Sequence, residues 1–146
     1  MNVLVAISIA IALVAATSVV GLVLRSRTGR VIPARADVVR SADLPAPAVL
    51  GSQATLLQFS TTFCAPCRAT HRVLGQLAAQ RTGVAHLDVD LTEHPELATR
   101  FNILQTPTTF LLDATGTVRA RVGGAPRSDE LVARLDNLIG STHVAA

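Results

Sequence analysis

The stretch from Met1 to Leu24 contains no charged side chain, and this apolar run limits what the rest of the 146-residue chain can form. As a helix, Val3–Leu24 would be roughly 33 Å long at about 1.5 Å per residue, enough to cross a hydrocarbon core of about 30 Å. The run shows no amphipathic stripe, and a small domain could hardly enclose it. We therefore predict a transmembrane anchor at residues 1–24, which leaves room for one domain of ordinary size.

A cleaved signal peptide fits the run less well than a permanent anchor. The run exceeds the usual apolar length of about 7–15 residues, only the terminal amine precedes it as a positive charge, and no small-x-small cleavage site follows it. Arg25, Arg27 and Arg30 follow directly. By the positive-inside rule they place the N-terminus outside and the domain in the cytoplasm. Attraction of these arginines to anionic headgroups of either leaflet leaves an extracytoplasmic domain open.

The basic character of the chain, with a pI of about 10.1, is concentrated beside the anchor. Residues 25–50 hold five arginines against two aspartates, whereas residues 51–146 are neutral overall. With four Phe, no Tyr and no Trp, the chain has few rings for base stacking, so we expect no nucleic-acid partner. Pro33, Pro45 and Pro47 interrupt residues 25–50, which predicts an extended linker there and a compact domain over 51–146.

Downstream of Gly51 the hydrophobic period alternates between that of strands and that of helices. We predict strands over Ala54–Ser60, Val84–Asp90, Thr108–Asp113 and Thr117–Val122, and helices over Ala65–Gln80, over Pro95–Phe101 and from Ser128 onward. The strand–helix–strand opening implies a right-handed crossover with parallel pairing, and the last two strands form a hairpin. The expected fold class is α/β, a mixed four-stranded sheet with helices on both faces.

The two cysteines lie where the first predicted strand passes into the first predicted helix. Unpaired N–H groups and the positive dipole end at a helix start favour a thiolate, so we expect a lowered pKa for the Cys64 thiol. Cys67, one helical turn later on the same face, could attack a mixed disulfide on Cys64 and release the partner. Pro66 suits the first helical turn because it has no N–H to leave unpaired.

The same cysteines could instead be half of a zinc site. Cys64, Cys67 and His71 share one helical stripe, and His86 or His94 could supply a fourth ligand. Structural zinc cysteines usually lie in loops, however, and the sequence has no second closely spaced ligand pair. We therefore expect no metal here.

Two segments resemble the thioredoxin family. Phe59–Arg68, FSTTFCAPCR, is similar to the active-site strand and turn, where the motif is commonly W-C-G-P-C-[KR]. Phe101–Thr108, FNILQTPT, resembles the run Y-x-I-x-x-x-P-T, whose proline is cis. Asp113–Gly116 and Val122–Gly124 are similar to the family's hairpin turn and the glycine that follows it. The resemblance covers about 51–140 and implies the thioredoxin fold.

The resemblance also implies roles for the matching residues. Cys64 would be the attacking thiol and Cys67 the resolving thiol. Pro107 would pack in its cis form against the disulfide and leave the backbone of Thr106 open to pair with an extended substrate segment. Gly123 would permit close approach of that substrate. No cofactor is implied, because the electrons reside on the sulfur pair.

Several positions depart from the family pattern. Phe63, an expected substrate-binding residue, replaces the usual Trp and keeps an apolar cover, and Ala65 replaces a Gly at a position that tunes the redox potential. Gln58 stands where thioredoxins have a buried Asp that handles the proton of the resolving thiol, and an amide cannot take that proton. His86 falls where the family often has a Lys near that Asp. We take His86 as a candidate proton acceptor, with a structural histidine as the alternative.

The sequence thus predicts a membrane-tethered thiol:disulfide oxidoreductase that acts on protein thiols and disulfides. In the cytoplasm we expect a reductase, recharged by a thioredoxin reductase or a low-molecular-weight thiol; outside, it could reduce or oxidise exported proteins. Two alternatives stay open. One is a non-catalytic module that holds a membrane partner in the Thr106–Pro107 groove, and the other is a carrier of a soft metal ion between the two thiolates.

Overall fold

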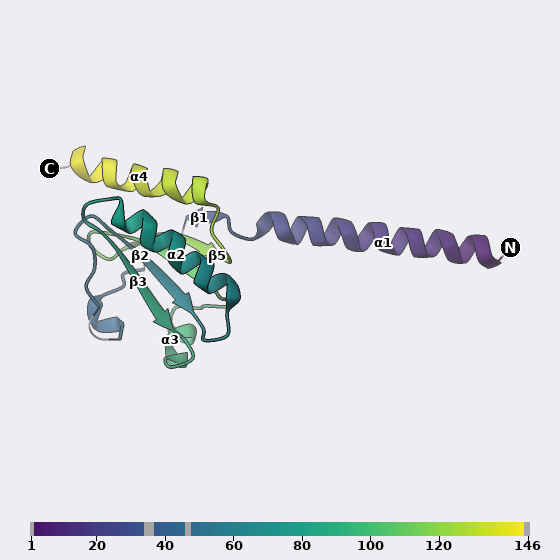
Figure 1. Ribbon diagram of the computed structural model, residues 1–146, viewed down its shortest axis with the longest axis horizontal. Coiled ribbons are helices and arrows are strands. Elements are labelled where there is room, and N and C mark those ends of the chain that lie inside the picture. The colour runs from purple at the N-terminus through teal and green to yellow at the C-terminus, as the bar shows by residue number, and fades with distance from the viewer. Residues whose placement is uncertain (1, 34–36, 46–47, 145–146) are drawn as a thin grey trace.

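In the computed structural model, described for residues 2–33, 37–45 and 48–144, one long helix projects from an α/β domain (Figure 1). This helix, α1 (Asn2–Arg27), contains the predicted apolar run and continues past Leu24 into the expected linker. Its segment Asn2–Leu24 has a mean hydropathy of 2.7 and is not buried anywhere against the domain. A helix of this length and composition can cross a membrane or serve as a signal sequence. The outermost residues of the predicted anchor and domain, 1 and 145–146, lie outside the described residues.

The domain contains a five-stranded mixed sheet in the order β1-β5-β4-β2-β3. The strands are β1 (Val31–Pro33), β2 (Ala54–Ser60), β3 (Val84–Asp90), β4 (Thr108–Asp113) and β5 (Val118–Gly123). β2 and β3 are parallel and are joined by α2 (Ala65–Ala79), whereas the other neighbouring pairs are antiparallel. The four strands and the parallel crossover expected from the hydrophobic period are confirmed, although the last strand starts at Val118 rather than at Thr117.

The prediction of an extended linker over residues 25–50 is wrong for much of that segment, which packs against the sheet. Val31–Pro33 pairs with β5 and forms the fifth strand. A short helical turn, η1 (Ser41–Asp43), follows. Val39 is fully buried and its N–H donates to the Gly116 carbonyl over 2.8 Å, and Leu44 is also buried. This segment packs because burial of its few apolar side chains is favourable. The composition does not show this, because arginines and prolines surround these apolar residues in the sequence.

Helices cover both faces of the sheet, as predicted (Figure 1). α2 and α4 (Ser128–Val144) cover one face, and α3 (Pro95–Arg100) lies on the other. Because alternate residues of a strand point to opposite faces, Leu56 and Gln58 of β2 face α2, and Leu57 and Phe59 face the α3 side. β2 is buried along its whole length. Its carboxyl end leads into the cysteine pair, so a fully buried strand of the sheet positions the candidate site.

Candidate active site

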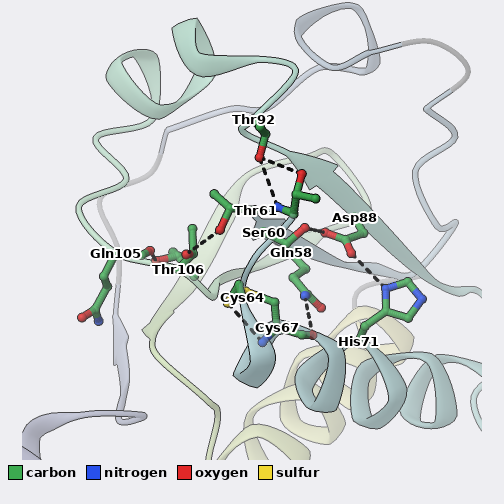
Figure 2. Close-up of a disulfide and its surroundings, with 12 residues drawn as sticks. Gln58, Ser60, Thr61, Cys64, Cys67, His71, Asp88, Thr92, Gln105 and Thr106 are labelled. Carbon is green, nitrogen blue, oxygen red and sulfur yellow. Dashed lines mark hydrogen bonds and ion pairs between the residues drawn. A yellow bond between two sulfur atoms is a disulfide. The ribbon is translucent and has the colours of Figure 1, made fainter.

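The two cysteines lie at the junction of β2 and α2, where the sequence predicts them. Cys64 is the N-cap residue of α2, Cys67 lies in the first turn, and their sulfurs form a disulfide with the Cα atoms 5.2 Å apart (Figure 2). The backbone N–H of Cys67 donates to the Sγ of Cys64 over 3.2 Å. Cys64 is 9% exposed and Cys67 3%. A backbone N–H at the helix start, which the Cys64 carbonyl also accepts over 3.1 Å, therefore points at the sulfur of the more exposed cysteine.

The loop before β4 approaches this disulfide with a cis Thr106–Pro107 peptide bond, the isomer that the resemblance implies. The Oγ1 atoms of Thr61 and Thr106 lie 3.3 Å apart, which links this loop to the turn before the cysteines (Figure 2). Within the described residues, the backbone N–H and C=O of Thr106 make no hydrogen bond. Both groups can therefore pair with an added strand. The Pro107 carbonyl accepts from the N–H of Gly124 over 2.7 Å, which fixes the loop to the end of β5.

Gly123 lies at that end of β5, packed closely against the cis-proline loop. A Cβ atom at this position would lie 2.3 Å from the Nε2 of Gln105. A larger residue would therefore displace the Gln105 side chain from the surface where a substrate strand would lie. The structure thus places Gly123 beside the cis-proline loop at the end of β5.

Phe63 does not form the expected apolar cover, because its side chain is 98% exposed. The turn between β2 and α2 directs the ring into solvent, away from both hydrophobic cores. Leu104, in the cis-proline loop, is 84% exposed. Among the side chains described after Gly51, these two are the large apolar groups that remain exposed. The turn before Cys64 and the cis-proline loop thus each carry one apolar side chain that the domain leaves exposed.

Gln58 is fully buried beneath the first turn of α2. Its Nε2 donates to the Cys67 carbonyl over 3.0 Å, and its buried Oε1 has no partner among the described residues. The side chain therefore positions the resolving cysteine. It has no basic atom for the thiol proton, as the sequence predicts.

His86 is not among the residues that line the surface beside the cysteines. It pairs with Leu56 across the parallel strands, and its buried Nε2 has no hydrogen-bond partner among the described residues. Burial, followed by the nearby His71, lowers the pKa of His86, and Asp88 opposes this shift. The residue opposite Gln58 on β3 is Asp88. Asp88, rather than His86, is thus in register with Gln58, and His86 lies two residues earlier on the same face of β3.

A surface hollow, here called the cysteine hollow, is lined by Cys64, Cys67, Ser60, His71 and Asp88 together with Thr61, Arg68 and Arg72. Asp88 accepts a hydrogen bond from Ser60 Oγ over 2.6 Å, and its other oxygen lies 3.0 Å from His71 Nδ1 (Figure 2). Sequence reasoning missed Asp88 and considered His71 only as a metal ligand. Asp88 could have been found by aligning the two predicted parallel strands, because it then lies opposite Gln58. In the described part of the chain, no three His, Cys, Asp or Glu side chains form a group that could hold a metal ion.

Comparison with known proteins agrees with this geometry. The family model for thioredoxin matches residues 46–137, and so begins within the segment first assigned to the linker. Thioredoxin from Alicyclobacillus acidocaldarius subsp. acidocaldarius is 33% identical over 95 residues, which cover 63% of this chain and 88% of that protein. The H-type thioredoxin of Oryza sativa subsp. indica is 32% identical over 91 residues, covering 62% of this chain and 73% of the relative.

Solved structures show the same relationship. Thioredoxin NaTrxh from Nicotiana alata superposes with a TM-score of 0.52 at 29% identity, covering 59% of this chain and 73% of that one. The family model begins at residue 46, so α1 lies outside the segment that it matches. With its cysteine pair at the start of α2 and its cis-proline loop, the chain belongs to the thioredoxin family and is a thiol–disulfide oxidoreductase.

Proposed function

We propose that this protein is a membrane-tethered protein-disulfide reductase in which Cys64 attacks the substrate and Cys67 resolves the mixed disulfide. The observation that carries the proposal is the position of Cys64 as N-cap of α2, with the N–H of Cys67 directed at its sulfur. In the reduced protein the same N–H and the helix dipole stabilise a thiolate at Cys64 and so lower the pKa of that thiol.

The exchange proceeds in two steps. The Cys64 thiolate attacks one sulfur of a substrate disulfide, forms a mixed disulfide and releases the other substrate sulfur as a thiolate. The Cys67 thiolate then attacks Cys64 Sγ, and the bond to the substrate breaks. The substrate leaves with two added electrons, and the enzyme keeps the Cys64–Cys67 disulfide. The electrons are carried by the sulfur pair alone, so the proposal needs no further cofactor.

The surroundings of the disulfide support a protein substrate. The free backbone groups of Thr106 can pair with an extended segment. Phe63 and Leu104 would be buried by a partner with an apolar surface, as exposed apolar groups at an interface usually are. A small disulfide would use the sulfur pair but gain little from these side chains.

The attachment of α1 supports a redox site held close to the membrane surface. The N–H of Gly29, just after α1, donates to the Gly123 carbonyl over 2.8 Å. The Nη2 of Arg127, before α4, donates to the Ser26 carbonyl over 3.0 Å. The end of the proposed anchor is therefore bonded to the strand end that carries Gly123. We infer that the substrates are membrane proteins or proteins bound at the membrane surface.

By the positive-inside rule, the arginines that follow the apolar run favour a cytoplasmic domain. A reducing compartment makes reduction the expected direction, with the Cys64–Cys67 disulfide recharged by a thioredoxin reductase or a low-molecular-weight thiol.

Trapping of partners tests this function. Cys67→Ala in the full chain should accumulate membrane-associated proteins as mixed disulfides on Cys64, released by dithiothreitol. The double variant Cys64→Ser, Cys67→Ala is the matched control and should trap none. Recovery of no mixed disulfide under mild oxidation would instead favour a binding module, as would a cellular role that survives Cys64→Ser. Stoichiometric zinc or copper in protein purified under reducing conditions would favour a metal carrier.

A further inference from the structure

His71 and Asp88 form a polar pair beside the disulfide that the thioredoxin motifs do not account for. His71 Nδ1 lies 3.0 Å from Asp88 Oδ2, and Asp88 Oδ1 accepts the hydrogen bond of Ser60 Oγ over 2.6 Å (Figure 2). The imidazole and the carboxylate both line the cysteine hollow. Because the Ser60 hydroxyl and the His71 imidazole each contact one oxygen of Asp88, these contacts orient the carboxylate and the imidazole.

Both partners are held on regular elements that also position Cys67. His71 follows Cys67 by four residues in α2, and side chains at this spacing lie on the same face of a helix. Asp88 lies opposite Gln58 in the parallel β2–β3 pair, and Gln58 bonds the Cys67 carbonyl. The helix and the strand thus bring the pair to the same hollow as the resolving cysteine.

The resolving step needs a proton acceptor near Cys67. A thiol with an ordinary pKa of about 8.5 is only a few per cent thiolate at pH 7, and the 3% exposure of Cys67 further favours the neutral form. Gln58 cannot accept the proton. His86 does not line the cysteine hollow, and its imidazole nitrogen Nε2 is buried without a partner among the described residues. His71 is 55% exposed at its side chain and keeps contact with the hollow.

We propose that His71, oriented by Asp88, accepts the proton of the Cys67 thiol across the cysteine hollow while Cys67 resolves the mixed disulfide; this rests on the proposed function. With Nδ1–H donated to Asp88, Nε2 is the nitrogen of His71 that takes the proton. Because Nε2 lies on the ring edge that points away from the sulfurs (Figure 2), a water molecule in the hollow carries the proton from the Cys67 sulfur to it. The Cys67 thiolate forms the bond to Cys64 Sγ, and the substrate sulfur leaves with the electron pair of the broken bond. The imidazolium then returns its proton to the departing thiolate or to solvent.

Charged and titratable groups from two elements surround His71. From β3, Asp88 contacts its Nδ1, and the ring of His86 lies 4.7 Å from the ring of His71. From α2 itself, Arg68 and Arg72 line the same hollow. Asp88 is the group in direct contact, so its removal should impair the acceptor even with His71 in place.

The test follows the full chain in detergent as it reacts with stoichiometric 5,5′-dithiobis(2-nitrobenzoate). Attack by Cys64 releases the first thionitrobenzoate, and resolution by Cys67 releases the second. His71→Ala should slow the second release about 100-fold at pH 7, the lower range for a positioned base, and leave the first unchanged. The deficit should shrink as the pH passes the pKa of the Cys67 thiol, and added imidazole should restore the rate at pH 7.

Two further variants complete the experiment. Asp88→Asn should slow the second release by a smaller factor, with no rescue by imidazole, because the histidine remains but loses its orienting carboxylate. His94→Ala, which removes a histidine paired with Glu96 outside the hollow, is the matched control and should behave as the unsubstituted protein. A second release of normal rate at pH 7 in His71→Ala, or equal slowing of both releases, would overturn the inference. Failure of the proposed function would appear differently, as the lack of a Cys67-dependent second release in the unsubstituted chain.

Discussion

The backbone N–H of Cys67 donates a hydrogen bond to the Sγ of Cys64 over 3.2 Å, within the turn that begins α2. This contact connects the fold to the chemistry, because the end of the buried strand β2 and the start of the helix together place the sulfur of Cys64 at a backbone donor of the first helical turn. The two cysteines of one motif therefore have different environments. Cys64 faces the helix start, whereas Cys67 is more deeply buried beside Gln58, His71 and Asp88.

The exposed ring of Phe63 should contribute to protein substrates but not to small ones. Phe63→Ser should raise the KM for reduction of a protein disulfide about five- to tenfold, since loss of the buried ring costs about 1 kcal/mol. The rate with a small aromatic disulfide should stay the same. Val49→Ser is the control, because Val49 is 73% exposed but outside the site. Equal KM values for Phe63→Ser and the parent chain with the protein disulfide would show that the ring is not part of the substrate surface.

The packing of residues 37–45 against the sheet should contribute to stability through Gly116. This residue has φ +81°, and an added Cβ would lie 2.3 Å from the Val39 carbonyl oxygen. Gly116→Ala should therefore lower the free energy of unfolding by about 2 kcal/mol in denaturant titrations. Gly140→Ala in α4 is the matched control, since a Cβ there meets nothing within 4 Å and should be neutral or slightly stabilising. Unchanged stability of Gly116→Ala would mean that the upstream segment is not held as the structure shows.

Asp113 should make part of the stability depend on pH. Burial would raise the pKa of this carboxyl, but hydrogen bonds from Thr115, Arg119 and Thr117 outweigh it and hold the pKa below its usual range. The carboxylate therefore stabilises the fold above the unfolded pKa of about 3.9, and this contribution disappears as the pH falls through the lower folded value.

Asp113→Asn should accordingly lower the free energy of unfolding by about 2 kcal/mol at pH 7, as expected when a hydrogen-bonded charge is lost. The unfolding curves of the variant and the parent should converge below about pH 4. Glu93→Gln, at an exposed position before α3, serves as the control. A difference between Asp113→Asn and the parent that stays constant down to pH 2 would contradict the assignment.

The orientation of the anchor can be read with reporter fusions. An enzyme that is active only outside the cytoplasm, fused after Ala146, should be inactive, and a fluorescent protein that matures in the cytoplasm should be bright at the same position. The fusion protein should stay in the membrane fraction after alkaline washing and keep the mass of the uncleaved chain. An active external reporter would place the domain outside, and loss of the N-terminal segment would identify α1 as a signal sequence.

The change along the chain between the hydrophobic period of strands and that of helices was sufficient to predict most of the sheet. Ala54–Ser60 and Thr108–Asp113 are central strands with continuous apolar character, and Ala65–Gln80 has one clear apolar face. The period could not reveal Val31–Pro33, because three residues are too few to show alternation and a proline ends them. Val39 likewise gives no local signal, since its burial depends on the distant turn at Gly116.

The site was predictable where its residues belong to one local motif. Cys64, Cys67 and the cis-proline at Pro107 follow from short runs with a specific backbone geometry. Asp88 and His71 belong to different elements, and only the parallel register and the helix face bring them to the same hollow. The exposure of Phe63 was missed for the same kind of reason, because a substitution for Trp in a turn does not reveal where the ring points.

The titration of Cys64 in the reduced full chain tests the central claim most directly. The rate of iodoacetamide alkylation at Cys64, followed by mass spectrometry from pH 4 to pH 10, reports the fraction of thiolate. Stabilisation by the helix start predicts a pKa for Cys64 at least one unit below the ordinary value of about 8.5, with Cys67 reacting only at higher pH. A Cys64 thiol that titrates like free cysteine, near 8.5, would contradict the account.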